Sequence, residues 1–233
     1  MIVFDHVVKR YPNGREALAG VTFRIDEGEM VFLTGRSGAG KSTVLKLIAL
    51  IERPTRGTVL VGGKNLGALP ARHVPAHRRS IGVVFQDHRL LPDRPVFDNV
   101  ALPLVVAGFP LKETDKRVRA ALDQVGLLDK ERLLPPELSV GEQQRVGIAR
   151  AVVSKPALLI CDEPTGNLDR ELAMEVMRLL KRFQSVGVTV VVATHDMHSV
   201  RELGQRTLVL DAGRIARGGD VDEPLPSIVA SRI

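Results

Sequence analysis

The sequence predicts an α/β fold in which a mainly parallel sheet is flanked by helices and interrupted by an inserted helical segment. An apolar run at residues 30–34 leads through a glycine-rich loop into an apolar stretch long enough to open a helix. Continuous apolar runs at 157–161 and 189–194 are typical of parallel strands buried on both faces. Between residues 87 and 156 the apolar positions recur at helical spacing instead.

Length and composition favour one globular domain. The chain has 233 residues, of which 44% are hydrophobic and 26% charged, enough to bury a core. Its 33 basic and 27 acidic residues give a net charge of +6, which favours polyanions or an anionic membrane face without choosing between them. The single cysteine, Cys161, excludes an intramolecular disulfide and fits a reducing compartment.

No targeting or membrane-spanning segment is expected. Residues 1–5 lack the basic and apolar regions of a signal peptide, and no apolar run approaches the roughly 20 residues that span a bilayer. We therefore expect any work at a membrane to need a partner that supplies the span.

The first part of the chain is predicted to be rich in strands, at residues 2–8, 18–25, 30–34, 58–61 and 81–85. The first two strands indicate an N-terminal antiparallel β subdomain. The basic stretch at 65–80 is expected to be loop-rich and to form a solvated face rather than a nucleic-acid site, because no aromatic residues are interleaved for stacking on bases.

Residues 87–156 are predicted to form a helical subdomain inserted into a core made of residues 1–86 and 157–233. Helices are expected at 112–125 and 141–153, where apolar residues fall on one face. In the remaining core we expect a helix at 170–185 and a closing hairpin at 207–217, and no further domain after residue 219.

The glycine-rich loop after the strand at 30–34 matches a phosphate-binding P-loop in its expected context. Glycines allow backbone N–H groups to surround a polyphosphate, and the helix N-terminus adds positive potential. The predicted phosphate site comprises Gly35, Ser37, Gly38, Ala39, Gly40, Lys41, Ser42 and Thr43. Lys41 would reach the β- and γ-phosphates and the Ser42 hydroxyl a Mg²⁺ ion. The fold predicted is therefore a P-loop NTPase (RecA-like) core.

Two more features carry candidate chemistry. Asp162 and Glu163 follow the apolar run at 157–161, where a P-loop fold places a Mg²⁺ ligand, so Asp162 is a candidate ligand and Glu163 a candidate polariser of the attacking water. An Asp-Glu pair without a P-loop is usually a solvated turn. Ser139 with Gly141 offers an anion site at a helix start, although these residues alone favour a plain N-cap closed by Glu142.

These motifs, in this order and over essentially the whole chain, resemble the ATP-binding cassette (ABC) ATPases. The resemblance implies that Tyr11 stacks on adenine and that Gln86 senses Mg²⁺ beside a docking groove. It further implies that Ser139 and Gly141 contact the γ-phosphate bound to a second subunit, that Asp169 lies across the dimer, and that His195 is a switch at the γ-phosphate.

The resemblance thus implies an ATPase whose two copies close head to tail over two Mg-ATP molecules. Lys41, Gln86, Glu163 and His195 would be the catalytic residues, and Ser42, Gln86 and Asp162 the metal ligands. The subunit would lie in the cytoplasm, peripheral on the inner face of the plasma membrane, bound to an integral membrane partner and to no specific nucleic acid.

Longer stretches at 85–94, 142–153 and 163–169 narrow the resemblance to the cell-division branch of the family, which implies control of cell-wall hydrolases across the membrane. The alternatives are the lipoprotein-release and macrolide-export ATPases, an ATP-gated clamp on nucleic acid, and a nucleotide-binding scaffold with weak turnover. Val140 keeps the last alternative open, because it stands where the family usually has a glycine and a β-branched residue disfavours positive φ. Glu142 replaces the commoner glutamine.

Overall fold

The computed structural model describes residues 1–219 and begins with a small antiparallel sheet. Its strand order is β2-β1-β4-β5, from β1 (Ile2–Arg10), β2 (Glu16–Ile25), β4 (Arg56–Val61) and β5 (Lys64–Asn65). This sheet confirms the predicted antiparallel β subdomain. The prediction for the chain after residue 219 lies outside the described residues.

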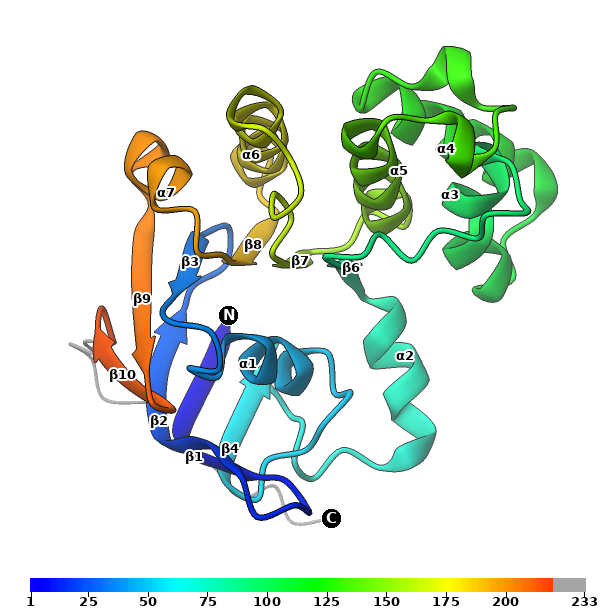
Figure 1. The fold of residues 1–233 in the computed structure, drawn as a ribbon. Helices are drawn as coiled ribbons and strands as arrows, with labels where there is room; N and C mark the ends of the chain where they lie inside the picture. Colours follow the sequence, from blue (N-terminus) through cyan, green and yellow to red (C-terminus); the bar gives the residue numbers. More distant parts are fainter. Residues whose placement is uncertain (220–233) are drawn as a thin grey trace.

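A second, six-stranded sheet has the order β10-β9-β3-β8-β7-β6 (Figure 1). All its neighbouring strands are parallel except the pair β9–β10, which forms the predicted closing hairpin. The strands are β3 (Met30–Thr34), β6 (Ile81–Val84), β7 (Leu158–Asp162), β8 (Thr189–Ala193), β9 (Arg206–Asp211) and β10 (Arg214–Arg217). The carboxyl ends of β3, β7 and β8 meet at one edge, which is where ligands bind in sheets of this kind.

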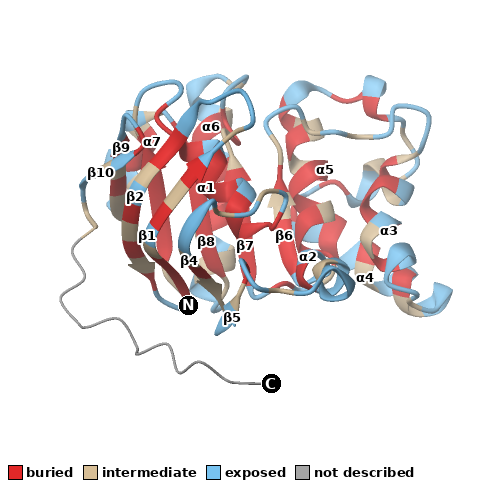
Figure 2. Cartoon of the chain, turned by 90° about the horizontal axis from the view of Figure 1, so that it is seen from below, coloured by how far each residue is buried: buried red, intermediate tan, exposed pale blue. Residues whose placement is uncertain are grey.

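Two hydrophobic cores explain why the central strands are continuous apolar runs. Along β7, Leu158 and Ile160 belong to the core that includes α1 (Lys41–Ile48), whereas Leu159 and Cys161 belong to the core that includes α5 (Val140–Val152) and α6 (Arg170–Ser185). Because successive strand residues point to opposite faces, residues 158–161 are all buried. Figure 2 shows this burial concentrated in the strands and in the inner sides of the helices. Burial also raises the pKa of the Cys161 thiol, which acts as packing.

The helices form two groups (Figure 1). Near the sheets are α1 (Lys41–Ile48), α6 (Arg170–Ser185) and α7 (Met197–Leu203), and set to one side are α3 (Val96–Val106), α4 (Leu111–Gln124) and α5 (Val140–Val152). Residues 1–219 also contain three 3-10 helices, η1 (Ala71–His73), η2 (Leu128–Lys130) and η3 (Pro135–Glu137), and the short helix α2 described below. The helix at 170–185 matches its prediction, whereas α7 was not predicted. Within residues 1–219, no helix is both long and apolar enough to cross a bilayer.

The basic stretch at 65–80 was predicted to be loop-rich with a solvated face, and four of its five basic residues are exposed. Part of it forms the short helix α2 (Val74–Arg79), which was not predicted. His77 is buried, and its Nε2 lies 2.8 Å from the Ile48 carbonyl oxygen. Arg78 donates to the carbonyl of Leu50 at 2.8 Å. These carbonyls lie at the C-terminal end of α1, where no further turn supplies N–H groups to donate to them. The basic residues therefore satisfy the end of α1.

Candidate functional site

The loop between β3 and α1 is shaped by glycines that approach neighbouring backbone closely. Gly35 has φ of +138°, and a β-carbon there would lie 2.1 Å from the Leu210 carbonyl oxygen. Gly40 has φ of +113°, and its β-carbon would lie 2.7 Å from the carbonyl oxygen of Ala17. Gly40 also precedes the first residue of α1 without a side-chain cap, and no acidic residue follows in the first turn. The helix therefore begins with N–H groups available to an anion.

Lys41, the first residue of α1, directs its ammonium group across the loop. Its side chain is buried, and Nζ donates to the carbonyl oxygens of Gly35 at 2.8 Å and Arg36 at 3.3 Å. The same Nζ lies 3.9 Å from Oε1 of Glu163. A positive charge thus stands between the loop and the end of β7.

The hydroxyl of Ser42, the second residue of α1, contacts the carboxyl end of β7. Ser42 Oγ donates to Oδ1 of Asp162 at 3.1 Å. Burial raises the pKa of the Asp162 carboxyl, which the Ser42 bond opposes in part. These two oxygens, 120 residues apart in sequence, are hard ligands of the kind that Mg²⁺ prefers.

Glu163 is mostly buried and is held by the segment that follows β8. Its Oε2 lies 2.8 Å from Nδ1 of His195 and accepts the backbone N–H of His195 at 3.2 Å. Glu163 has φ of +48°, a conformation that an L-residue keeps only where its surroundings hold it. The Glu163 N–H donates to the Ala193 carbonyl at 2.9 Å, which is one such restraint. The predicted pair of Glu163 and His195 is therefore brought together.

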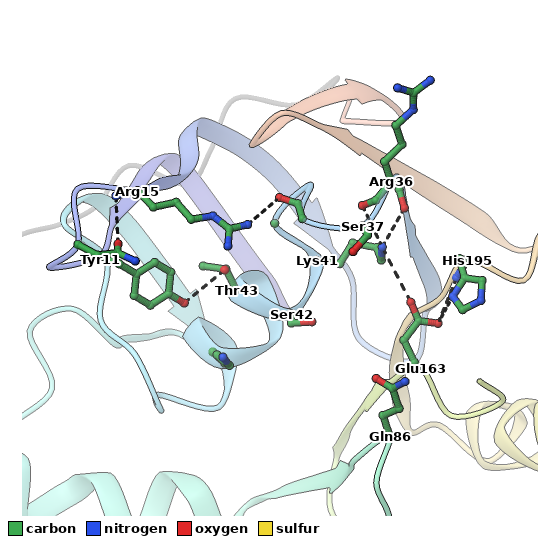
Figure 3. A pocket seen from close by; sticks show the side chains of 15 residues that line it. Tyr11, Arg15, Arg36, Ser37, Lys41, Ser42, Thr43, Gln86, Glu163 and His195 are labelled. Carbon is green, nitrogen blue, oxygen red and sulfur yellow. Dashed lines mark hydrogen bonds and ion pairs between the residues drawn. The ribbon is translucent and has the colours of Figure 1, made fainter. Parts of the chain in front are cut away.

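These groups line a cleft of about 860 Å³ (Figure 3). Tyr11 lines one end, where its hydroxyl lies 3.4 Å from Oγ1 of Thr43, and Gln86 lines the other beside Glu163. The predicted residues in its wall are Tyr11, Gly35, Ser37, Gly38, Gly40, Lys41, Ser42, Thr43, Gln86, Glu163 and His195. The predicted residues Ala39 and Asp162 do not line the cleft: Ala39 is buried within the loop, and Asp162 is hydrogen-bonded to the cleft residue Ser42.

Four cleft residues were not predicted: Asn13, Arg15, Arg36 and Lys46. Arg15 Nη2 donates to the Gly38 carbonyl at 3.2 Å, which places a second cation at the loop. In the sequence, Arg15 follows the turn at 12–14, four residues after Tyr11, and only this proximity signals a contact.

Ser139, Gly141 and Asp169 do not line this cleft. Ser139 caps α5, because its Oγ accepts the Glu142 N–H at 3.3 Å while a Glu142 oxygen accepts the Ser139 N–H at 2.9 Å. Asp169 caps α6 through the Leu172 N–H at 3.0 Å. A β-carbon on Gly141 would lie 3.2 Å from Leu172, so the two helix starts are adjacent. The favoured N-cap reading of Ser139 and Glu142 is confirmed.

The predicted backbone strain at Val140 is wrong. Val140 is the first residue of α5 and is absent from the non-glycine residues with positive φ in the described chain. Its side chain is 47% exposed. Because the helix begins at this position, the backbone takes ordinary helical angles that a β-branched residue accepts.

Comparison with known proteins agrees with this geometry. The family model described as ABC transporter matches residues 18–166. The cell division ATP-binding protein FtsE of Escherichia coli K12 is 56% identical over 218 residues, 94% of this chain and 98% of that protein. FtsE of Bacillus subtilis is 46% identical over 217 residues, 93% of this chain and 95% of that protein.

Solved structures agree as well. The dimeric structure of MJ0796, described as a bacterial ABC transporter cassette, has a TM-score of 0.85 at 36% identity and covers 93% of this chain and 97% of its own. Its post-hydrolysis state with bound ADP and Pi matches at a TM-score of 0.85, 35% identity and the same coverage. The predicted fold is confirmed. The chain belongs to the ABC transporter family.

Proposed function

We infer that this chain is the ATP-binding and ATP-hydrolysing subunit of an ABC complex that acts in bacterial cell division. The observation that carries this function is the convergence of Lys41, Glu163 and His195 at the mouth of the glycine loop. Identity of 44–56% to FtsE proteins over nearly the whole chain supports the cell-division role over lipoprotein release or macrolide export.

ATP would fill the cleft from Tyr11 to His195. The Tyr11 ring would stack on adenine, and the N–H groups of residues 38–43 would surround the phosphates at the start of α1. The Lys41 ammonium would exchange its bonds to the Gly35 and Arg36 carbonyls for phosphate oxygens.

The residues around Ser42 fit a Mg²⁺ ion. Ser42 and Asp162 bring two oxygens together, and the Gln86 amide in the same cleft would supply a third. Burial raises the pKa of Asp162, so a nearby cation would be favourable. Mg²⁺ binds few protein ligands when phosphates and water complete its shell. When bound, the ion would neutralise charge on the β- and γ-phosphates.

Glu163 would orient the attacking water or take its proton. One of its oxygens is held by His195, which leaves Oε1 directed toward Lys41 and the cleft. His195, 69% exposed at its side chain, would hold the γ-phosphate and water in line. Phosphoryl transfer needs little covalent chemistry from the protein, so positioning and charge stabilisation would supply the rate.

A second copy of the chain would complete the site. Ser139, Gly141 and Asp169 lie at two adjacent helix starts outside the cleft of their own chain. In a head-to-tail homodimer they would face the γ-phosphate held by the other copy. The dimeric description of the MJ0796 cassette supports this arrangement.

The membrane partner would be an FtsX-like protein, docked near Gln86 and the helices α3–α5. The subunit itself would be peripheral on the inner face of the plasma membrane, where its net charge of +6 suits an anionic surface. Closure of the dimer would then pull on the partner and control cell-wall hydrolysis.

The test is Glu163→Gln, which keeps the side-chain shape and removes the charge. We expect ATP turnover to fall by about 10²–10⁴-fold, the usual contribution of general acid–base catalysis, while ATP still binds and a closed dimer accumulates on size-exclusion chromatography. Glu27→Gln, at a carboxylate with 81% exposed side chain far from the cleft, is the control and should hydrolyse like the wild type. Rapid steady-state hydrolysis by Glu163→Gln would remove Glu163 from this role.

A further inference from the structure

The segment after β6 contains an unusual turn. His88 has φ of +54° and Arg89 φ of +48°, and they are the one neighbouring pair of non-glycine residues with positive φ among residues 1–219. A β-carbon makes this conformation unfavourable, so it persists only where other groups hold it. The turn begins two residues after Gln86 and therefore affects where the Gln86 side chain lies.

Contacts within the turn are mostly exposed to water. The Arg89 N–H donates to the Asp87 carbonyl, and Arg89 Nε lies 3.1 Å from Oδ1 of Asp87. The Arg89 guanidinium also lies 4.4 Å from the centre of the Phe85 ring. The side chains of this ion pair are more than 60% exposed, so water screens their attraction and little of the restraint comes from them.

Arg150 supplies a restraint from outside the turn. It lies in the last turn of α5, and its Nη1 donates to the Arg89 carbonyl at 2.6 Å while Nη2 donates to the His88 carbonyl. A planar guanidinium fork matches two neighbouring acceptors, which a lysine ammonium does not. Arg150 has no ion pair with a carboxylate in the described part of the chain, and burial lowers its pKa. Its donors are therefore directed at these two carbonyls.

The bonds of Arg150 connect two parts of the predicted catalytic apparatus. At one end of α5, Ser139 caps the helix, and at the other end Arg150 holds the turn that follows Gln86. In Figure 1 the chain that leaves β6 passes α5 before it reaches α3. The Gln86 amide nitrogen lies against Gly166, where a β-carbon would be 3.5 Å away, just after Glu163.

We propose that Arg150 is a positioning residue for the ATPase reaction. It holds the His88–Arg89 turn in the left-handed conformation, which places Gln86 in the cleft. The loop at residues 86–89 then moves together with α5. A partner that displaces this loop would thereby displace Ser139. This inference rests on the proposed function, because it assumes the role given there to Gln86.

The first test is Arg150→Lys, which keeps the charge and loses the fork. We expect kcat to fall about tenfold with KM for ATP unchanged within about twofold, since Tyr11 and Lys41 are untouched. Hydrogen exchange of the backbone amides in 86–91 should become about tenfold faster, because the turn opens more often. Arg117→Lys is the control, since Arg117 pairs with a glutamate of its own helix. Unchanged exchange and kcat in Arg150→Lys would overturn the proposal.

The second test asks whether Arg150 acts through the strained turn. In the Arg150→Lys background, Arg89→Gly should restore much of kcat and of the amide protection, because glycine accepts positive φ without the cost of a β-carbon. Arg89→Ala removes the same side chain and keeps that cost, so it should restore neither. Equal behaviour of the two double variants would overturn the proposal. A wild type without ATP hydrolysis would refute the proposed function instead, and the exchange measurement would still test Arg150.

Discussion

Replacing Gly35 with alanine tests whether the phosphate loop owes its shape to close contact with β9. The added β-carbon would lie 2.1 Å from the Leu210 carbonyl oxygen and 3.3 Å from the β-carbon of Ala39, and the φ of +138° is unfavourable for an L-residue. The backbone conformation costs about 1–3 kcal/mol, and displacing a well-packed neighbour costs about 1–3 kcal/mol more. The expected loss is therefore about 2–6 kcal/mol of a total that is typically about 5–15 kcal/mol.

The measurement is urea denaturation followed by circular dichroism, together with ATP binding. Gly62→Ala is the matched control, because Gly62 also has positive φ, +54°, but a β-carbon there meets nothing within 4 Å. Its cost should be limited to the backbone term, about 1–2 kcal/mol. The reasoning is refuted if both variants lose the same free energy of unfolding and bind ATP equally well.

Two further predictions concern single side chains. Burial raises the pKa of Asp162, so the folded chain holds the proton of this carboxyl more tightly than the unfolded chain does. The free energy of unfolding should therefore fall as pH rises from the pKa of the unfolded chain to that of the folded chain, and it should stay lower above this window. Without nucleotide, Asp162→Asn should remove this fall and be more stable than the wild type at neutral pH. Urea midpoints measured across the pH window test this. A wild type whose stability rises relative to that of the variant as pH rises would contradict the prediction. Val140→Gly should leave the ATPase rate unchanged and lower the free energy of unfolding by about 0.5–1 kcal/mol, because Val140 already has helical angles. A severalfold gain in rate would restore the interpretation that Val140 impairs the contact of Ser139 and Gly141 with the γ-phosphate.

Much of the fold was predictable because its central strands are buried on both faces. Residues of β7 and β8 alternate between two cores, so they appear in the sequence as continuous apolar runs. The helix α6 was predictable for a related reason, since one side of a long helix is buried. By contrast, α7 has seven residues and buries only Ser199 and Val200, which is too little for a periodic signal.

The chemistry of the site was predictable where it is local in sequence. The loop at 35–43 has its own pattern, and Asp162 and Glu163 follow a recognisable strand. The contacts of Arg15 and Arg150 were not predictable, because each depends on two segments that approach only in the folded chain, 23 and 61 residues apart. Val140 was misjudged because its conformation depends on where α5 begins, which sequence patterns define poorly.

The burial of Cys161 makes the native chain convenient for thiol-specific labelling. It is the only cysteine in the sequence, it has no exposed surface, and burial raises its pKa, so alkylating reagents that need a thiolate will not reach it. A cysteine introduced at Val186, which is 77% exposed just after α6, would therefore be the one reactive thiol. A fluorophore or spin label attached there would report distances between two copies without any change to the native cysteine.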